Sequence, residues 1–211
     1  VQSNHRKFPE FYDVRKRAFK NRFSKESKLF WKGMNYYCNG FFDAALKFFD
    51  EINDSKLSQK NLAELEFIRA RCFHMTGYIS KALRYYENAL RNGYNDKSIY
   101  VFMGRAKEQN GNFSDAVMTY GELIRKGSVP DYVYTDIGFA YVKKGDAGKA
   151  IEAFNRSAER EINSAAALGG IALAYLIAGD FEKSKEYCQK AEESYRSMDY
   201  YSHRRDLDDY K

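Results

Sequence analysis

Apolar residues recur every three or four positions through most of this chain, in segments separated by short polar breaks that contain a glycine. Residues 101–110 and 134–144 show this spacing and stop immediately before Gly111 and Gly145, and a second periodic segment follows each glycine. Such spacing is typical of one face of an α-helix, and glycine readily takes the positive φ that closes a helix. The pattern therefore predicts pairs of antiparallel helices joined at these glycines.

The glycine breaks are regularly spaced along the chain. Gly77, Gly111, Gly145 and Gly179 lie 34 residues apart, and Gly40 lies 37 residues before Gly77. A constant period of this length is typical of a solenoid in which each repeat packs on its neighbours. Small residues occupy the points where the two helices of one repeat must cross closely, because a larger side chain there would hold them apart. These pairs are Gly104 with Ala116, Gly138 with Ala150, and Ala172 with Ser184.

Composition agrees with a folded array of helices. The 211 residues are 44% apolar and 30% charged, and they include two prolines, which leaves long helices uninterrupted. Because stacked repeats share one continuous core, we expect a single folded array. The most apolar run, residues 165–179, is shorter than the about 20 residues that a membrane-spanning helix needs. We therefore expect it to be a packed helix in register with the repeat.

The repeated unit resembles the tetratricopeptide repeat, whose motif has aromatic residues at its fourth, eleventh and twenty-fourth places, small residues at its eighth and twentieth, and glycine at its fifteenth. The unit at residues 131–164 matches with Tyr134, Gly138, Tyr141, Gly145, Ala147, Ala150, Phe154 and Ser157. Four further units match in register, at residues 26–59, 63–96, 97–130 and 165–198. The resemblance implies an all-α fold, a right-handed α-solenoid of five tandem helix-turn-helix repeats.

The repeats leave a segment at each end of the chain. Residues 1–25 precede them, and the first 32 residues contain ten Lys and Arg against three acidic residues, whereas the remainder has a net charge of −1. Within this segment, residues 9–23 predict an amphipathic helix, a candidate remnant of a preceding repeat. Its basic patch consists of Arg15, Lys16, Arg17, Lys20 and Arg22. Ser24 is a candidate cap for the helix that follows. Residues 199–211 are predicted to form a charged C-terminal tail.

One connection inside the array differs from the others. Residues 53–62, between the first two repeats, are longer and more polar than the other connections, so we expect the loosest joint there.

The residues that catalysis or metal binding requires are not assembled in this sequence. The three cysteines, Cys38, Cys72 and Cys188, form no CxxC pair, which gives no sign of a disulfide framework or a zinc site. Their use fits a reducing compartment, and we expect a cytoplasmic location. No phosphate-binding glycine loop follows a predicted strand, and no catalytic motif is present. We expect neither catalysis, nor a metal site, nor a cofactor.

The resemblance also implies where a partner binds. In the family, the first helix of each repeat lines the concave face with the second, fifth, ninth, twelfth and thirteenth places of the motif. Here these places are mostly apolar and aromatic with a polar middle, which suits a helix or an extended peptide. About half are expected to pack on neighbouring first helices instead. The candidate partner-binding residues are Phe30, Met34, Tyr37, Phe67, Arg71, His74, Val101, Arg105, Tyr132, Phe139, Val142, Leu173, Leu176 and Ile177.

The implied function is that of a non-catalytic scaffold for protein–protein interaction. The alternative is binding of nucleic acid or another acidic surface by the basic N-terminal helix, which a pI of about 9.0 favours. The repeats themselves have no positive surplus, and this weighs against nucleic acid. Leu173, Leu176 and Ile177 have no polar residue among the groove places around them, and an exposed apolar patch usually marks an interface. We expect a partner, or a second copy in a homo-oligomer, to cover them in preference to the charged tail.

Overall fold

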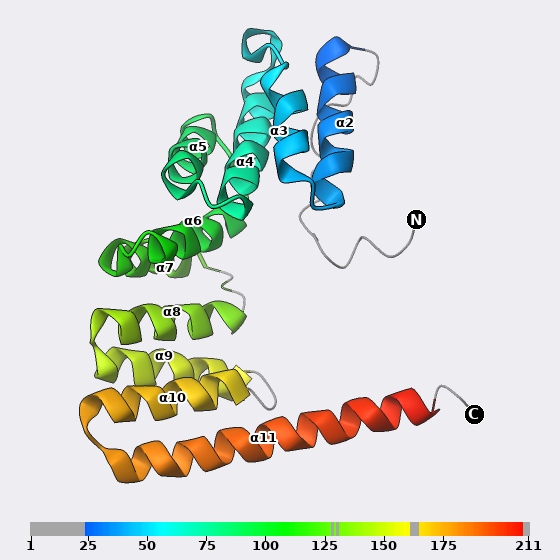
Figure 1. Ribbon diagram of the computed structural model, residues 1–211. Helices are drawn as coiled ribbons and strands as arrows, with labels where there is room; N and C mark the ends of the chain where they lie inside the picture. The colour runs from blue at the N-terminus through cyan, green and yellow to red at the C-terminus, as the bar shows by residue number, and fades with distance from the viewer. Residues whose placement is uncertain (1–23, 128, 130, 161–164, 209–211) are drawn as a thin grey trace. The chain divides into compact units, whose positions relative to one another are not determined.

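The computed structural model describes residues 24–127, 129, 131–160 and 165–208. The regular structure within these ranges is helical, and no strand occurs in them. The chain divides into two compact units, residues 1–110 and residues 111–211 (Figure 1). The predicted helix at residues 9–23, with the basic patch of Arg15, Lys16, Arg17, Lys20 and Arg22, lies outside the described residues.

The first unit consists of two helical hairpins and one further helix. They are α2 (Lys25–Cys38) with α3 (Phe42–Asp50), α4 (Gln59–Met75) with α5 (Ile79–Arg91), and α6 (Ser98–Gln109). The two helices of each hairpin pack together, and each hairpin contacts the first helix that follows it. A short 3₁₀ helix, η1 (Asp54–Lys56), precedes α4. Ser24 caps α2 as predicted, because its hydroxyl accepts a hydrogen bond from the backbone N–H of Ser27 at 3.0 Å.

The second unit begins with one helix and continues with two hairpins. They are α7 (Phe113–Arg125), α8 (Asp131–Lys144) with α9 (Ala147–Arg160), and α10 (Ala165–Ala178) with α11 (Phe181–Asp208). Helix α10 packs against both α8 and α9. Helix α11 has 28 residues against 14 in α10, and it continues past the start of α10 (Figure 1). Residues from 199 onwards, predicted to form a charged tail, continue α11 as far as Asp208.

No helix in the described ranges is both long enough and apolar enough to cross a lipid bilayer.

The predicted turn glycines end the first helix of each pair. Gly40, Gly77, Gly111, Gly145 and Gly179 have φ values of 82°, 83°, 78°, 83° and 81°. At the first turn, the N–H of Gly40 donates to the carbonyl of Tyr37 at 3.0 Å, and the N–H of Phe41 donates to that of Tyr36 at 3.0 Å. These bonds satisfy carbonyls that the end of α2 leaves open, as helix C-caps do. The prediction of an all-α fold of tandem helical hairpins is confirmed.

Small residues allow the helices of a hairpin to approach closely. A Cβ atom on Gly33 would overlap the ring of Phe49, and a Cβ atom on Gly138 would overlap the ring of Phe154. Both rings are completely buried. At the equivalent crossing of α10 and α11, the hydroxyl of Ser184 donates to the carbonyl of Ala172 at 2.9 Å. The space that a small residue leaves on one helix is thus filled by a side chain of the other helix, as close packing requires.

A buried polar network joins the first hairpin to the second. On α4, Arg69 places Nη1 at 2.9 Å from the carboxylate of Asp54 and 3.3 Å from that of Glu66. The side-chain amide of Asn88 on α5 donates to Glu66 at 3.1 Å. Burial raises the pKa of Glu66, and the hydrogen bond from Asn88 and the charge of Arg69 oppose that rise. The connection at residues 53–62, expected to be loose, is therefore anchored to α4 at its start.

Candidate functional site

In the first unit, the structure places most of the predicted partner-binding residues inside the core. Phe30, Met34, Tyr37 and Phe67 have no exposed surface, and Val101 is 1% exposed. The ring of Phe67 stacks on that of Tyr94 with centroids 4.4 Å apart. These five predicted side chains pack between helices, so they have no surface to offer a partner in the described arrangement.

The polar residues predicted in the first unit cluster around a buried histidine. His74 on α4 lies with Nδ1 at 3.2 Å from the hydroxyl of Tyr86, and it is 8% exposed. Burial, then the charge of Arg71, lowers its pKa to about 4, and Arg105 acts in the same direction. The guanidinium of Arg71 is 3.7 Å from the centroid of the Phe102 ring, which lies within cation–π range. His74 is therefore neutral near pH 7, between two arginines.

In the second unit, the predicted residues are mostly at the surface. Tyr132 is 46% exposed, and Leu173, Leu176 and Ile177 are 38%, 49% and 46% exposed. Phe139 is half-buried, with its ring edge-on to Phe154 at 5.0 Å, and Val142 is buried. Four large apolar side chains on α8 and α10 are thus accessible, and α10 contains no charged residue.

Exposed and half-buried residues of α10 form two adjacent stripes. Ala166, Leu173 and Ile177 share one face, because separations of four, seven and eleven residues bring side chains to the same side of a helix. Helix α8 contacts α10. We define the α8–α10 surface as this stripe of α10 together with the two aromatic residues at matching motif places on α8. Its members are Tyr132, Phe139, Ala166, Leu173 and Ile177.

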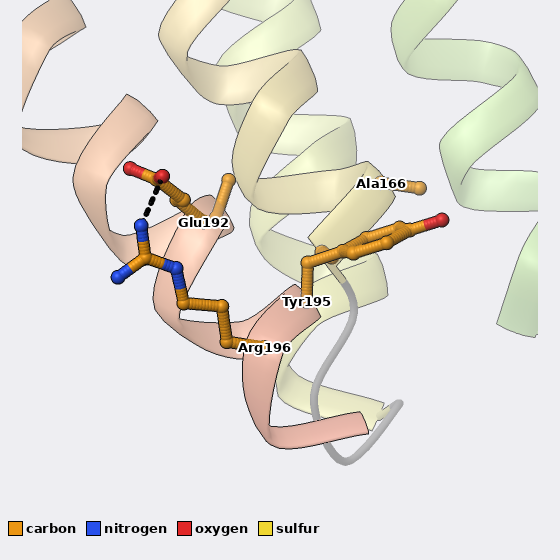
Figure 2. Close-up of a pocket in the computed structure, with 6 residues that line it drawn as sticks. Ala166, Glu192, Tyr195 and Arg196 are labelled. Carbon is orange, nitrogen blue, oxygen red and sulfur yellow. Dashed lines mark hydrogen bonds and ion pairs between the residues drawn. The ribbon is translucent and has the colours of Figure 1, made fainter. Parts of the chain in front are cut away.

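The second stripe of α10 consists of Ala165, Gly169 and Leu176, and it adjoins α11. Ala165 and Ala166 line a cavity of about 550 Å³ together with Ala191, Glu192, Tyr195 and Arg196 of α11. In Figure 2 the ring of Tyr195 lies beside Ala166, and the ion pair between Glu192 and Arg196 forms the polar edge. Three of the six residues that line the cavity are alanines.

Sequence reasoning missed two features here, one in the second stripe of α10 and one on α11. The first is Gly169, where an added Cβ would meet no atom within 4 Å, whereas at the next residue, Gly170, it would overlap the Phe154 ring. The second is Cys188, which is exposed, although the other repeats place a buried aromatic ring at the same motif place. A cysteine at a motif place that is aromatic in the other repeats was the signal in the sequence that could have revealed this feature.

The described part of the chain brings no metal-binding cluster together. No group of three or more His, Cys, Asp or Glu side chains there has a geometry that would hold a metal ion. Burial strongly raises the pKa of the Cys72 thiol, so this cysteine stays protonated and is a poor nucleophile. The basic patch cannot be compared with these surfaces, because its residues lie outside the described ranges.

One family model matches part of the chain. Residues 135–199 match the family model of the tetratricopeptide repeat. No curated protein matches the chain in sequence. Solved structures match it in fold.

MamA from Desulfovibrio magneticus RS-1, residues 41 to the end, has a TM-score of 0.75 at 17% identity and covers 83% of this chain and 98% of its own. Another crystal structure of MamA has a TM-score of 0.73 at 20% identity and covers 83% and 94% of the two chains. YrrB, described as a TPR protein with an unusual peptide-binding site, has a TM-score of 0.67 at 15% identity and covers 92% of both. At these identities the likeness is one of fold.

Proposed function

We propose that this chain, whose residues 135–199 match the tetratricopeptide repeat, is a non-catalytic interaction scaffold that binds a helix or an extended peptide of a partner protein along the α8–α10 surface. The observation that carries this proposal is the exposure of Tyr132, Leu173 and Ile177 on two helices that contact each other. Large apolar side chains at neighbouring exposed places usually mark an interface. Aromatic residues such as Tyr132 are also enriched among the residues that dominate binding energy.

The chemistry of this surface favours an apolar ligand face. Helix α10 has no charge to pair with a ligand, and Lys143, next along α8, is an exposed cation at the edge. An amphipathic helix with an apolar stripe and an acidic residue near one end would match both features. YrrB, a protein of the same fold, is described as having a peptide-binding site, which supports the class of ligand. Among the polar candidates of the first unit, Arg105 on α6 is half-buried, so part of its side chain is exposed to a partner.

The site and the ligand class can be tested together by selection from a displayed peptide library. We expect full-length protein to enrich sequences with apolar residues at spacings of three and four. The variant Leu173→Glu should lose this enrichment by at least about tenfold, since a buried unpaired carboxylate costs more than 1.4 kcal/mol. Met118→Glu is the matched control, because Met118 is a 69% exposed apolar residue of α7 outside this surface. Equal enrichment by both variants would place binding elsewhere.

The state of the cysteines is the basis for the cellular compartment that we propose. Cys38, Cys72 and Cys188 are all free thiols. Free thiols are typical of proteins in a reducing environment, and we propose a cytoplasmic location. Fractionation of cells that express the protein would test this, and recovery in an oxidising compartment would contradict it.

A further inference from the structure

The turn between α4 and α5 carries a corner of aromatic rings that holds a lysine. The ring of Phe73 stacks on that of Tyr85 with centroids 5.2 Å apart, and Tyr78 lies edge-on to Phe73 at 6.3 Å, with the ring planes at 86°. The ammonium of Lys81 is 5.4 Å from the ring centroid of Phe73 and 5.3 Å from that of Tyr78. Both distances are within cation–π range, in which the negative face of a ring attracts a positive charge. The second hairpin therefore supplies the cation for its own rings.

The first hairpin has the same corner at the same motif places. Tyr36 stacks on Phe48 with centroids 5.2 Å apart, and Phe41 lies edge-on to Tyr36 at 6.5 Å, with the ring planes at 72°. Tyr36 is 39% exposed and Phe41 is 62% exposed, so solvent reaches both rings. We define the aromatic corner as Tyr36, Phe41 and Phe48. It lies within the first unit, at the turn from α2 to α3.

The aromatic corner lacks the lysine that accompanies such rings elsewhere in the chain. The nineteenth motif place is Ala44 in the first repeat, whereas it is Lys81, Lys149 and Lys183 in the second, fourth and fifth repeats. Lys149 and Lys183 place their ammonium groups 5.7 Å and 5.2 Å from the aromatic ring at the eleventh place of their own repeat. No lysine or arginine in the described part of the chain makes a cation–π contact with the three rings of the aromatic corner. The first repeat thus keeps the rings of this contact without its cation.

The chemistry of the aromatic corner specifies its occupant. The matching pair of nearly perpendicular rings in the second hairpin holds an ammonium group. Lysine suits this position because its four-carbon stem covers apolar surface while the charged end stays at the rings. The corner is also open, since Phe41 is mostly exposed, so it touches a cation from one side only. Such a weak contact favours a lysine that other contacts of a larger partner hold in place, because they raise its effective concentration at the rings.

We propose that the aromatic corner binds a lysine side chain of a partner protein, whose ammonium takes the place that Lys81 occupies in the second hairpin. This site goes beyond the α8–α10 surface, because it lies in the other compact unit and recognises a positive charge. A partner that uses it must present an exposed lysine, whereas the α8–α10 surface requires an apolar stripe.

NMR signals of the rings in the full-length protein report binding directly. Tyrosine and phenylalanine rings are isotope-labelled, and the signals of Tyr36 and Phe41 are assigned with Tyr36→Phe and Phe41→Leu. The probe is the acetylated and amidated tripeptide Ala-Lys-Ala at millimolar concentrations, and the control peptide has uncharged norleucine instead of lysine. We expect the lysine peptide to shift both signals and the norleucine peptide to shift them at least about threefold less, because one exposed cation–π contact changes affinity roughly two- to fivefold. Equal shifts with the two peptides, or none with either, would overturn the proposal.

Substitutions at the nineteenth place test the site from within the protein. Ala44→Lys should shift the signals of the aromatic corner without peptide and abolish their response to it, whereas uncharged Ala44→Gln should keep the response. Lys81→Ala should free the second corner, so that the Tyr78 signal begins to respond to the lysine peptide. An undiminished response in Ala44→Lys would show that the lysine binds elsewhere. Leu173→Glu, on the α8–α10 surface, should leave the response unchanged, so that failure of one proposal does not imply failure of the other.

Discussion

Arg69 on α4 donates a hydrogen bond from Nη2 to the backbone carbonyl of Phe49 at 2.7 Å, near the end of α3. The carbonyls of the last turn of a helix have no partner within the helix, and here Arg69 from the next repeat donates to the Phe49 carbonyl beside the backbone N–H of Ile52. The same guanidinium contacts Asp54 and Glu66. One arginine therefore joins the end of one hairpin, the connection after it and the first helix of the next.

We expect Arg69→Ala to destabilise the first unit by about 3 kcal/mol, because the change leaves Glu66 as a buried carboxylate without its cation and removes the donor to Phe49. Urea unfolding followed by circular dichroism measures this. Arg84→Ala is the control, since Arg84 is exposed on α5 and should change stability by less than about 0.5 kcal/mol. Equal effects of the two substitutions would mean that the network contributes nothing.

The lowered pKa of His74 predicts a loss of stability in acid. Its pKa falls from 6.5 to about 4 on folding, first through burial and then through the charge of Arg71. Between these values the unfolded chain binds a proton that the folded chain does not, so stability decreases as the pH falls from 6.5 towards 4. The loss should approach about 3 kcal/mol. Denaturation midpoints at pH 7 and pH 4.5 test this, and His74→Gln should remove this part of the pH dependence. An unchanged slope in the variant would contradict the assignment.

Two adjacent glycines of α10 should respond in opposite directions to the same substitution. Gly170→Ala forces a Cβ against the Phe154 ring, and overpacking of this kind costs about 1–3 kcal/mol. Gly169→Ala meets no atom, and alanine is favoured over glycine within a helix by about 1 kcal/mol. Thermal unfolding of the two variants gives the comparison, and each serves as the control for the other. Destabilisation by Gly169→Ala would show that the position is not open.

The basic patch is expected to steer acidic partners to the protein. Reversing the charge of Arg15, Lys16 and Arg17 to glutamate should slow association with an acidic peptide about tenfold at low salt, with less effect as salt is raised. Stopped-flow measurements at two salt concentrations test this, with the melting temperature as the control for folding. If the variant unfolds, the segment packs as part of the array and does not steer.

The helix pairs and their turns were predictable because they depend on local chemistry. Apolar spacing determines which face of a helix is buried, and glycine at the same place in each repeat permits the positive φ found at Gly40 and Gly145. The Arg69 network was not predictable in the same way. It depends on which residues of a polar connection come within reach of α4, and periodicity carries no such information.

The candidate site was predicted only in part, for a related reason. Motif places tell which face of the first helix a residue occupies, but not whether a neighbouring helix covers it. Phe30 and Leu173 are both groove candidates, and the first is fully buried whereas the second is exposed. Phe30 packs against the ring of Phe49 on α3, with centroids 5.9 Å apart, and the motif place of a residue does not specify such a contact.

The short turn at Gly145 means that α8 and α9 contact each other with little chain between them. Contacts between near neighbours in sequence form fast, because little loop entropy opposes them. During synthesis, each hairpin can therefore close as soon as its second helix emerges from the ribosome, before the next repeat exists. At that moment α8 and α9 expose to water the groove that α10 will later fill.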